Sequence, residues 1–374
     1  MISGAPLKVT LVGPLPPPAG GMANQMRQLA TLLAGEGVQV RTVRTQPPYW
    51  PAWVGRVPVL RAFFRLLPYL LQLWRGGAGA DVVHVMANSG WSWHLFAAPA
   101  VWLTRLRGAR VVLNYRGGEA GEFFARSFRW VRPTLQLVDR VVVPSEFLRQ
   151  VFQHHGVATV VVPNIVDLQR FRATSRLAPR EGEFRLLVAR NLEPLYDIET
   201  ALRAFRAVRA QVPGATLAIA GDGPDRERLQ RLVDDWTLGG SVTFLGQIDN
   251  QQMPAVLAAT DVMVNPSLAD NMPISILEAY ASGVPVVSTN VGGVPYIVDD
   301  GRTGLLVPPG EPARMADAIL RLYADPELRE SMVAEAARRS EGYTWREIWP
   351  RLAAVYRAEE ADSPRIHPHP VKPR

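Results

Sequence analysis

The sequence lacks the residues from which many disulfide and metal sites are built. Its 374 residues include no cysteine, which excludes a disulfide framework and any thiolate metal site. No Asp-x-Asp pair occurs, and the histidines at positions 84, 94, 154 and 155 have no neighbours at metal-ligand spacing. We therefore expect no metal cofactor.

Long apolar runs are also missing. The N-terminus, MISGAPLKVTLVG, has neither the basic start nor the long apolar core of a secretory signal peptide. The apolar stretch at residues 57–75 contains arginines and is too short to span a bilayer, which takes about 20 mainly apolar residues. We expect a cytoplasmic protein.

Acidic residues are scarce in the first half of the chain. Residues 1–172 contain 19 Lys and Arg against 7 Asp and Glu, a net charge of +12, whereas the remainder contains 22 against 27, a net of −5. A basic half favours an anionic partner. Because no stacking-aromatic or recognition-helix motif accompanies the charge, we expect no nucleic acid. An anionic membrane surface is the better partner.

The segment at residues 57–75 has two interpretations. At 100° per residue its polar side chains, together with Pro68, fall in one narrow stripe, formed by Arg61, Arg65, Pro68, Gln72 and Arg75. The remaining surface is apolar and aromatic. Such a helix packs on a sheet, or it binds a membrane interface, since arginines and bulky aromatics are typical of interfacial helices. The residues leave both interpretations open.

Apolar strands alternate with amphipathic helices along the chain. In the first half the predicted strands include KVTLVG at residues 8–13, DVVHVM at 81–86 and ARVVLNYRG at 109–117. After a polar stretch at residues 172–183, the pattern restarts with FRLLVAR and continues to TGLLVPP. This alternation predicts parallel sheets covered on both faces. The length suffices for two domains of ordinary size.

The block of residues 261–310 concentrates polar groups that suit a nucleotide diphosphate. The strand DVMVNPS ends in a loop with Asp270 and Asn271, and Pro273 stands where a helix should begin. The free amides and the positive dipole end of that helix attract phosphate. Glu278 follows in a largely apolar part of the helix, where its burial requires a partner.

Glycines follow several predicted strands. Gly20 and Gly21 follow the first strand and precede a helix, and Gly292 and Gly293 follow the strand VPVVST. Glycines let a backbone approach a ligand closely, and parallel sheets bind ligands beyond the carboxyl ends of their strands. A glycine pair is also typical of a tight turn without a ligand. We interpret a further strand-end turn, residues 221–223, as structural.

Together these motifs resemble the retaining glycosyltransferases of family 4. The nucleotide-sugar half of that family has an acidic residue, seven positions, Glu-Ala and then a small-Gly-x-Pro-Val-Val strand. Here the pattern runs from Asp270 through Glu278, with Asp in place of the usual Glu. The resemblance covers nearly the whole chain. It implies an α/β protein of the GT-B fold, in which two doubly wound, Rossmann-like domains face each other across a cleft.

The resemblance also implies where the domains lie. The N-terminal, acceptor-binding domain is expected at residues 1–172, together with a C-terminal return helix at about 346–360. The nucleotide-sugar-binding domain is expected at 184–345. Residues 164–167, NIVD, resemble the family's Asn-Gly-Val-Asp at the domain junction and are interpreted as structural. The last residues, 361–374, are proline-rich, and we expect them to be disordered.

The resemblance assigns roles to individual residues. Arg190, at the end of the strand FRLLVAR, would hold phosphate oxygens, Asp270 would contact sugar hydroxyls, and Glu278 would contact the ribose. Arg116 stands where the family commonly has a histidine that contacts the donor sugar. The predicted catalytic residues are Asp270, Arg190 and Arg116. The predicted donor-binding residues are Gly20, Gly21, Gln247, Asn271, Met272, Pro273 and Glu278.

Besides Asp270, two further features depart from the family pattern. The lysine expected five or six positions after Arg190 is absent, because Leu195 and Tyr196 occupy those positions. Arg116 stays charged where a histidine would be partly neutral. It either supplies part of the missing charge or pairs with Glu119 or Glu122.

The resemblance implies transfer of a hexose-type sugar from a UDP- or GDP-linked donor to a hydroxyl acceptor, with retention at the anomeric carbon. The basic first domain favours a lipid-linked or glycan acceptor, as in envelope or exopolysaccharide synthesis, and peripheral attachment to the inner face of the plasma membrane. Two alternatives are a catalytically silent nucleotide-sugar-binding or scaffold subunit and a nucleotide-sugar epimerase of the same fold. The sequence does not determine the base, the sugar, the acceptor or the oligomeric state.

Overall fold

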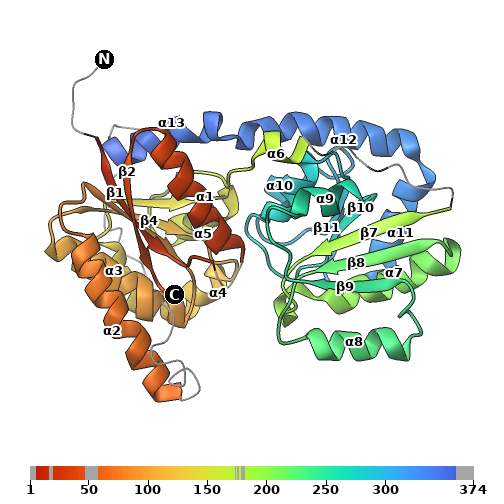
Figure 1. Ribbon diagram of the computed structural model, residues 1–374, viewed down its shortest axis with the longest axis horizontal. Helices are drawn as coiled ribbons and strands as arrows, with labels where there is room; N and C mark the ends of the chain where they lie inside the picture. The colour runs from red at the N-terminus through yellow and green to blue at the C-terminus, as the bar shows by residue number, and fades with distance from the viewer. Residues whose placement is uncertain are drawn as a thin grey trace. The chain divides into compact units, whose positions relative to one another are not determined.

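The chain folds into two compact units (Figure 1). Unit 1 comprises Met1–Pro163 with Trp349–Arg374, and unit 2 comprises Asn164–Ile348. The computed structural model describes residues 6–16, 20–46, 58–172, 174, 177 and 182–358, and for residues 58–63 it describes the backbone alone. The tail expected at 361–374 and most of the linker expected at 172–183 therefore lie outside the described residues.

The first domain was predicted from the sequence to end at residue 172, but the boundary between the units lies earlier. Unit 2 begins at Asn164, so the short helix α6, Leu168–Arg172, belongs to unit 2. Its Leu168 and Phe171 are buried in a core formed by unit 2 residues. The burial of these two apolar side chains assigns the segment to unit 2. The polar stretch after residue 172, on which the predicted boundary was based, gave no sign of this packing.

Unit 1 contains one parallel six-stranded sheet in the order β2-β1-β3-β4-β5-β6. Its strands are β1 Lys8–Gly13, β2 Gln39–Arg44, β3 Val82–Ala87, β4 Arg110–Tyr115, β5 Arg140–Val143 and β6 Val160–Val161. All six side chains of β3 are buried, because helices on both faces cover the centre of a parallel sheet.

The helices of unit 1 connect these strands by crossovers. They are α1 Gly21–Gly35, α2 Pro58–Gly76, the π-helical turn η2 Trp93–Ala97, α3 Ala98–Leu106, α4 Ala120–Leu135 and α5 Glu146–His154. The hydroxyl of Ser145 accepts a hydrogen bond from the backbone N–H of Leu148 at 3.3 Å and so caps the start of α5. Apolar side chains of α2 to α5 pack with those of β3, β4 and β5 into one core.

The last helix, α13 Trp345–Arg357, returns to unit 1 from Trp349 onward. Arg110 of β4 donates to the carbonyls of Tyr356 at 2.6 Å and Val355 at 3.1 Å. These carbonyls lie at the end of a helix, where no intrahelical partner exists. Arg110 therefore satisfies the end of the helix and holds it on the sheet.

Unit 2 repeats the architecture with a parallel sheet in the order β12-β11-β10-β7-β8-β9. Its strands are β7 Phe184–Ala189, β8 Ala215–Ala220, β9 Val242–Gly246, β10 Val262–Asn265, β11 Val286–Thr289 and β12 Leu305–Val307. Besides α6, its helices are η3 Pro194–Tyr196, α7 Ile198–Gln211, α8 Arg226–Asp235, α9 Met253–Ala258, α10 Ile274–Ala281, η4 Val294–Tyr296, α11 Pro312–Ala324, α12 Pro326–Ser340 and η5 Glu341–Tyr343.

The prediction of an α/β protein with two doubly wound sheets is confirmed. In unit 2 the strand order reverses at β7, which lies between β10 and β8. Loops diverge at such a switch point, so it is the usual ligand position of an open parallel sheet. Within the described part of the chain, no helix has the length and apolar character needed to cross a bilayer.

Candidate functional site

Two predicted site residues meet at the switch point of the unit 2 sheet. Arg190 follows β7 and Asp270 follows β10, and these strands are neighbours. Arg190 Nη2 lies 2.5 Å from Asp270 Oδ2, and each side chain is only 12% exposed. The carboxyl ends of two adjacent strands thus bring together a cation and an anion that are 80 residues apart in the sequence.

A network of polar side chains holds Arg190 in place. Its Nε donates to Asn265 Oδ1 at 2.7 Å. Asn265 is fully buried and donates through Nδ2 to the hydroxyl of Ser288 at 2.9 Å, and the hydroxyl of Ser267 donates to Asn265 Oδ1 at 2.9 Å. A buried network whose members are satisfied fixes the rotamer of each side chain. The orientation of the Arg190 guanidinium is therefore fixed by the protein itself, without a ligand.

Asn265, Ser267 and Ser288 were not among the site residues predicted from the sequence. The available signal is the polar Asn265 at the end of the otherwise apolar strand VMVN. A buried amide in such a strand requires hydrogen-bond partners.

The environment of Asp270 opposes its ionisation. Burial raises the pKa of this carboxyl above its ordinary value, and the charge of Arg190 together with hydrogen bonds from Asn271 and Ser267 partly offsets the rise. The backbone N–H of Asn271 donates to Asp270 Oδ1 at 2.9 Å. The carboxylate is thus held by the cation and by its own loop.

The loop between β10 and α10 is anchored from both sides. Asn164 Nδ2 donates to the carbonyl of Met272 at 2.8 Å, which confirms the structural interpretation of the NIVD segment. The backbone N–H of Gly293 donates to the carbonyl of Asp270 at 2.9 Å. Asn271 and Met272 are buried, with exposures of 5% and 6%.

The sequence analysis expected Gly292 and Gly293 to approach a ligand, but the structure places them against this loop. A Cβ on Gly292 would lie 2.0 Å from the carbonyl oxygen of Asp270, and one on Gly293 would lie 1.7 Å from that of Asn271. Gly292 also has a φ of +52°, which side chains rarely adopt. This close packing against the loop requires glycine at both positions, and the approach of the pair to a ligand stays a prediction.

Helix α10 begins at Ile274 with Pro273 as its N-cap, one residue later than the sequence predicted. Pro273 has an extended backbone with ψ of 115°, and the residue before a helix takes this conformation while its carbonyl already accepts the first bond. The carbonyl of Pro273 accepts from the N–H of Ile276 at 3.2 Å. The amides of the first turn follow directly after Asp270 and Asn271.

Glu278 lies within α10 and is only 7% exposed. Burial raises the pKa of its carboxyl to about 7, against the opposing charges of Arg170 and Arg190. Arg170 comes from α6, which packs on α10, and its Nη2 donates to Asn250 Oδ1 at 2.5 Å. Arg170 could not be predicted from the sequence, because only the packing of α6 brings it near the site.

Tyr196 occupies one of the two positions where the family pattern has lysine. The Arg190 guanidinium carbon lies 5.4 Å from the centre of its ring, within the range of a cation–π contact. The carbonyl of the preceding Leu195 accepts from the N–H of Leu268 at 2.9 Å. The segment that departs from the pattern therefore packs beside Arg190 without adding a second cation.

The remaining predicted residues of unit 2 lie near β8 and β9. Gln247 is exposed just after β9, at the edge of the sheet. Gly221 approaches the β7 loop so closely that a Cβ would lie 1.8 Å from the carbonyl oxygen of Arg190. This contact confirms the structural interpretation of the turn at 221–223. Arg190 follows β7 and Gln247 follows β9, so the two residues lie on separate loops at the carboxyl end of the sheet.

In unit 1, Gly20 and Gly21 lie at the start of α1. Gly20 is the N-cap with an extended backbone, φ −177° and ψ 159°. Among the residues that the structure describes, no atom lies within 4 Å of a Cβ built at Gly20, and its extended φ is open to any residue, so neither requires glycine there. Space beside the first turn of α1 is the feature that a ligand could use.

Arg116 follows β4, and its backbone N–H donates to the carbonyl of Ala87 at 2.9 Å. Burial lowers the pKa of its guanidinium to about 10, so it stays charged at neutral pH. Glu122, one of the glutamates considered as its partner, lies 3.3 Å from Arg126. The role of Arg116 toward a donor sugar stays a prediction.

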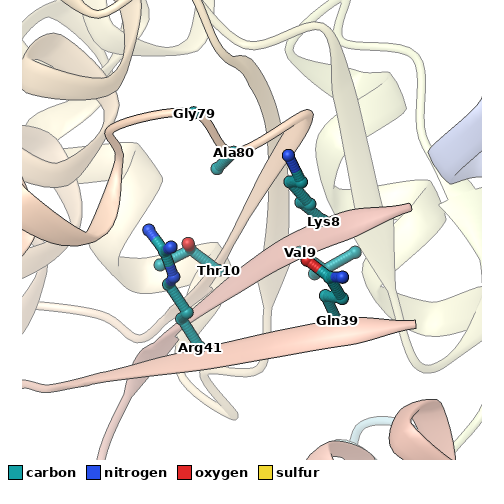
Figure 2. Close-up of a pocket in the computed structure, with 7 residues that line it drawn as sticks. All are labelled: Lys8, Val9, Thr10, Gln39, Arg41, Gly79 and Ala80. Atoms are coloured by element: carbon teal, nitrogen blue, oxygen red, sulfur yellow. The ribbon is translucent and has the colours of Figure 1, made fainter. Parts of the chain in front are cut away.

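A small pocket lies at the opposite end of the unit 1 sheet (Figure 2). Its lining residues are Lys8, Val9, Thr10, Gln39, Arg41, Gly79 and Ala80. Lys8 and Gln39 are the first residues of β1 and β2 and pair with each other. Because ligands of parallel sheets bind at the carboxyl ends, we assign no role in the site to this pocket. Among the residues that the structure describes, no group of three or more metal-ligating side chains occurs.

The sequence matches known proteins along both units. The model of Glycosyltransferase Family 4 matches residues 19–170, and that of Glycosyl transferases group 1 matches residues 169–339. A GDP-mannose-dependent alpha-(1-6)-phosphatidylinositol monomannoside mannosyltransferase of Mycobacterium tuberculosis is 31% identical, over 91% of this chain and 94% of that protein. The chain belongs to glycosyltransferase family 4.

Further comparisons give a second relative and two solved structures with the same fold. A phosphatidyl-myo-inositol mannosyltransferase of Mycobacterium leprae is 28% identical to this glycosyltransferase, over 90% of the chain and 92% of the relative. Among solved structures, sucrose-phosphate synthase of Thermosynechococcus elongatus superposes with a TM-score of 0.75 at 22% identity, covering 94% of this chain and 98% of that one. HepE of Anabaena, in complex with UDP, gives a TM-score of 0.71 at 18% identity, covering 94% and 100%. The expected GT-B fold of the glycosyltransferase is confirmed.

Proposed function

We propose that this glycosyltransferase moves a hexose-type sugar from a UDP- or GDP-linked nucleotide sugar to a hydroxyl acceptor, with retention at the anomeric carbon. The observation that carries the proposal is the preformed pair of Arg190 and Asp270 at the switch point of the unit 2 sheet, with Glu278 in the adjoining helix. This set combines a phosphate-binding cation with two carboxylates suited to hydroxyl groups.

Each residue has a distinct role toward the donor. The contacts with Asn265 and Asp270 use Nε and Nη2 of Arg190, and Nη1 carries the donors proposed to meet phosphate oxygens. The first turn of α10 supplies amides and a positive dipole end for the same diphosphate. Asp270 contacts sugar hydroxyls and Glu278 the ribose, because a carboxylate accepts hydrogen bonds from both.

We propose that the reaction needs no metal. As the diphosphate leaves, Arg190 and the N-terminal end of α10 stabilise its growing charge. The acceptor hydroxyl attacks from the face that the leaving group occupied, and its proton passes to the leaving phosphate oxygen. Arg116 adds positive charge on the side of the donor sugar.

We further propose a lipid-linked acceptor, in envelope or exopolysaccharide synthesis. Two relatives carry names that specify phosphatidylinositol or its monomannoside as the acceptor. The net charge of +12 in residues 1–172 favours an acceptor at an anionic surface. This setting includes peripheral association with the inner face of the plasma membrane.

A donor panel followed by a turnover assay tests the proposal. UDP, GDP, ADP and dTDP sugars are added to the purified chain, and one base class should raise its melting temperature. That donor should then be consumed only when a detergent-solubilised lipid acceptor is present, and proton NMR of the product should show the anomeric configuration of the donor sugar. Donor binding without turnover would instead support a silent subunit, and change of the donor sugar without acceptor would support an epimerase.

A further inference from the structure

Exposed large hydrophobic side chains gather on three consecutive helices of unit 1. Seven of them lie on α2, α3 and α4, namely Phe64, Leu67, Leu71, Trp74, Trp102, Leu106 and Trp130. Their exposures run from 38% at Phe64 to 75% at Leu106. We call this set the tryptophan face. Single exposed apolar residues are ordinary on a protein surface, whereas a contiguous group indicates an interaction site.

Helix α2 has apolar side chains on two opposite faces. Tyr69 and Leu73 are buried in the unit 1 core, while the residues at 64, 67, 71 and 74 recur at helical spacing on the outside. The two interpretations of the segment at 57–75 therefore concern different faces of one helix. The inner face packs on the sheet, and the apolar side chains of the outer face are 38% to 51% exposed.

Side-chain contacts join the three helices into one surface. The guanidinium carbon of Arg107 lies 4.4 Å from the centre of the Trp74 ring, which connects the end of α3 with that of α2. Trp102 donates through Nε1 to the hydroxyl of Thr134 at 3.1 Å, which connects α3 with α4 one turn beyond Trp130. Helices α2 and α3 lie side by side (Figure 1).

The same surface is basic. Its exposed arginines are Arg75, Arg105, Arg107, Arg126, Arg129 and Arg132. Helices α2 and α3 contain no Asp or Glu, and α4 contains one, Glu122, which pairs with Arg126. Asp139, which follows α4, pairs with Arg105 at 3.0 Å, so positive charge still exceeds negative charge on this surface. A second copy of the chain packed on this face would bring like charges together, so the charge favours an anionic partner.

We propose that the tryptophan face docks on an anionic lipid membrane. Tryptophan and leucine enter the headgroup boundary, and arginines beside them meet lipid phosphates, which is the composition of interfacial helices. The biological setting of this inference rests on the proposed function with its lipid-linked acceptor. The surface itself extends the membrane contact from α2 to α3 and α4.

Vesicle flotation of the full chain, without donor or acceptor, tests the inference. Binding to phosphatidylglycerol-containing vesicles should exceed binding to pure phosphatidylcholine by about tenfold or more and should weaken as salt screens the charges. The variant Leu106→Ser with Trp130→Ser should lose about tenfold in binding. The control Leu245→Ser with Tyr323→Ser, at exposed apolar positions of unit 2, should bind as the parent does.

Charge reversal provides a second, independent arm. Arg129→Glu with Arg132→Glu should reduce binding by about tenfold or more, because each basic residue near the surface adds to the attraction. The matched control reverses Arg314 and Arg321, which are exposed on α11 of unit 2. Circular dichroism melting of every variant checks that the fold is retained.

The outcomes separate this inference from the proposed function. Equal vesicle binding by the face variants and the controls overturns the inference. So does a parent dimer in sedimentation velocity that the Leu106 and Trp130 variant converts to a monomer, since the face would then contact a second copy. Sugar transfer to an acceptor in detergent, measured in parallel, should be unchanged in the face variants. Vesicle binding without any transfer contradicts the proposed function alone.

Discussion

At the scale of single residues, the site depends on charges that are buried in pairs. Arg190 and Asp270 are each 12% exposed and share a hydrogen-bonded contact. Removing water from two charges is costly, and their attraction compensates only when the geometry is good. Loss of one partner therefore leaves the other as an uncompensated buried charge. The pair is a source of preorganisation rather than of large net stability.

Replacement of Arg190 by methionine should destabilise unit 2 by about 3 kcal/mol at pH 8, because Asp270 is left charged and buried. At pH 5 the loss should be smaller, since without its cation the raised pKa of Asp270 lets the carboxyl take up a proton. Urea unfolding at the two pH values measures this. Addition of Asp270→Asn should restore most of the stability, and equal losses for single and double variants would contradict the argument.

The raised pKa of Glu278 predicts a pH dependence of stability. Its folded pKa of about 7 lies above the ordinary value of 4.5, so between these values the folded state binds the proton and the unfolded state does not. The free energy of unfolding should therefore fall by about 3 kcal/mol as the pH rises from 4.5 to 7. Glu278→Gln keeps the neutral form and should flatten the profile across that range. The idea fails if parent and variant show parallel profiles.

Glu278 also provides a test of donor contact. Glu278→Ala should weaken binding of the donor found in the sugar panel by about 1.5 to 3 kcal/mol, the value of a hydrogen bond to a charged group. Isothermal titration calorimetry measures the affinity. Glu330→Ala, at an exposed position of α12, is the control. An unchanged affinity in a folded Glu278→Ala protein would rule out the ribose contact.

At the scale of elements, the return of α13 to unit 1 depends on a buried polar contact. His84 Nδ1 and the hydroxyl of Tyr356 lie 2.8 Å apart, and both residues are buried. Burial lowers the pKa of His84 to about 3, and the charge of Arg116 adds to the effect. The ring is therefore neutral at pH 7 and needs a partner for each nitrogen, the other being the amide of Asn114 at 3.1 Å.

Tyr356→Phe should lower the free energy of unfolding of unit 1 by about 1 to 3 kcal/mol, because it leaves one nitrogen of His84 buried without a partner. The packing of the ring is kept, so the loss reports on the hydroxyl. Thermal unfolding of the full chain measures it. Tyr323→Phe, at a partly exposed tyrosine of α11, should change little, and equal effects of the two would argue against a buried contact.

At the scale of the whole molecule, the chain combines a basic first half with the absence of thiolate and Asp-x-Asp ligands. In the proposed metal-free reaction, cationic side chains and helix ends neutralise the leaving diphosphate. Glycosyl transfer should therefore keep nearly all of its rate in excess EDTA. Loss of turnover on chelation, with recovery on addition of Mg²⁺ or Mn²⁺, would show that a metal carries this charge instead.

Much of the fold could be predicted from the sequence because the local spacing of apolar residues specifies each strand and helix. Apolar runs such as VVHVMA in β3 are short, buried on both faces and separated by amphipathic helices, which specifies parallel sheets. The loop with Asp270 and Asn271 and the helix that contains Glu278 could be predicted for the same reason. Their residues lie within one strand, one loop and one helix.

Contacts between distant segments could only be found in the tertiary structure. The sequence by itself determined which residues have charge, where strands and helices alternate and which family the motifs resemble. The tertiary structure decided that Arg190 faces Asp270, that the charge of Arg170 opposes the pKa rise of buried Glu278, and that Gly292 packs against the loop. It also decided which face of α2 is buried. The physical reason is that burial and pairing depend on which distant strands become neighbours in the sheet. The local spacing of apolar residues does not specify these neighbours.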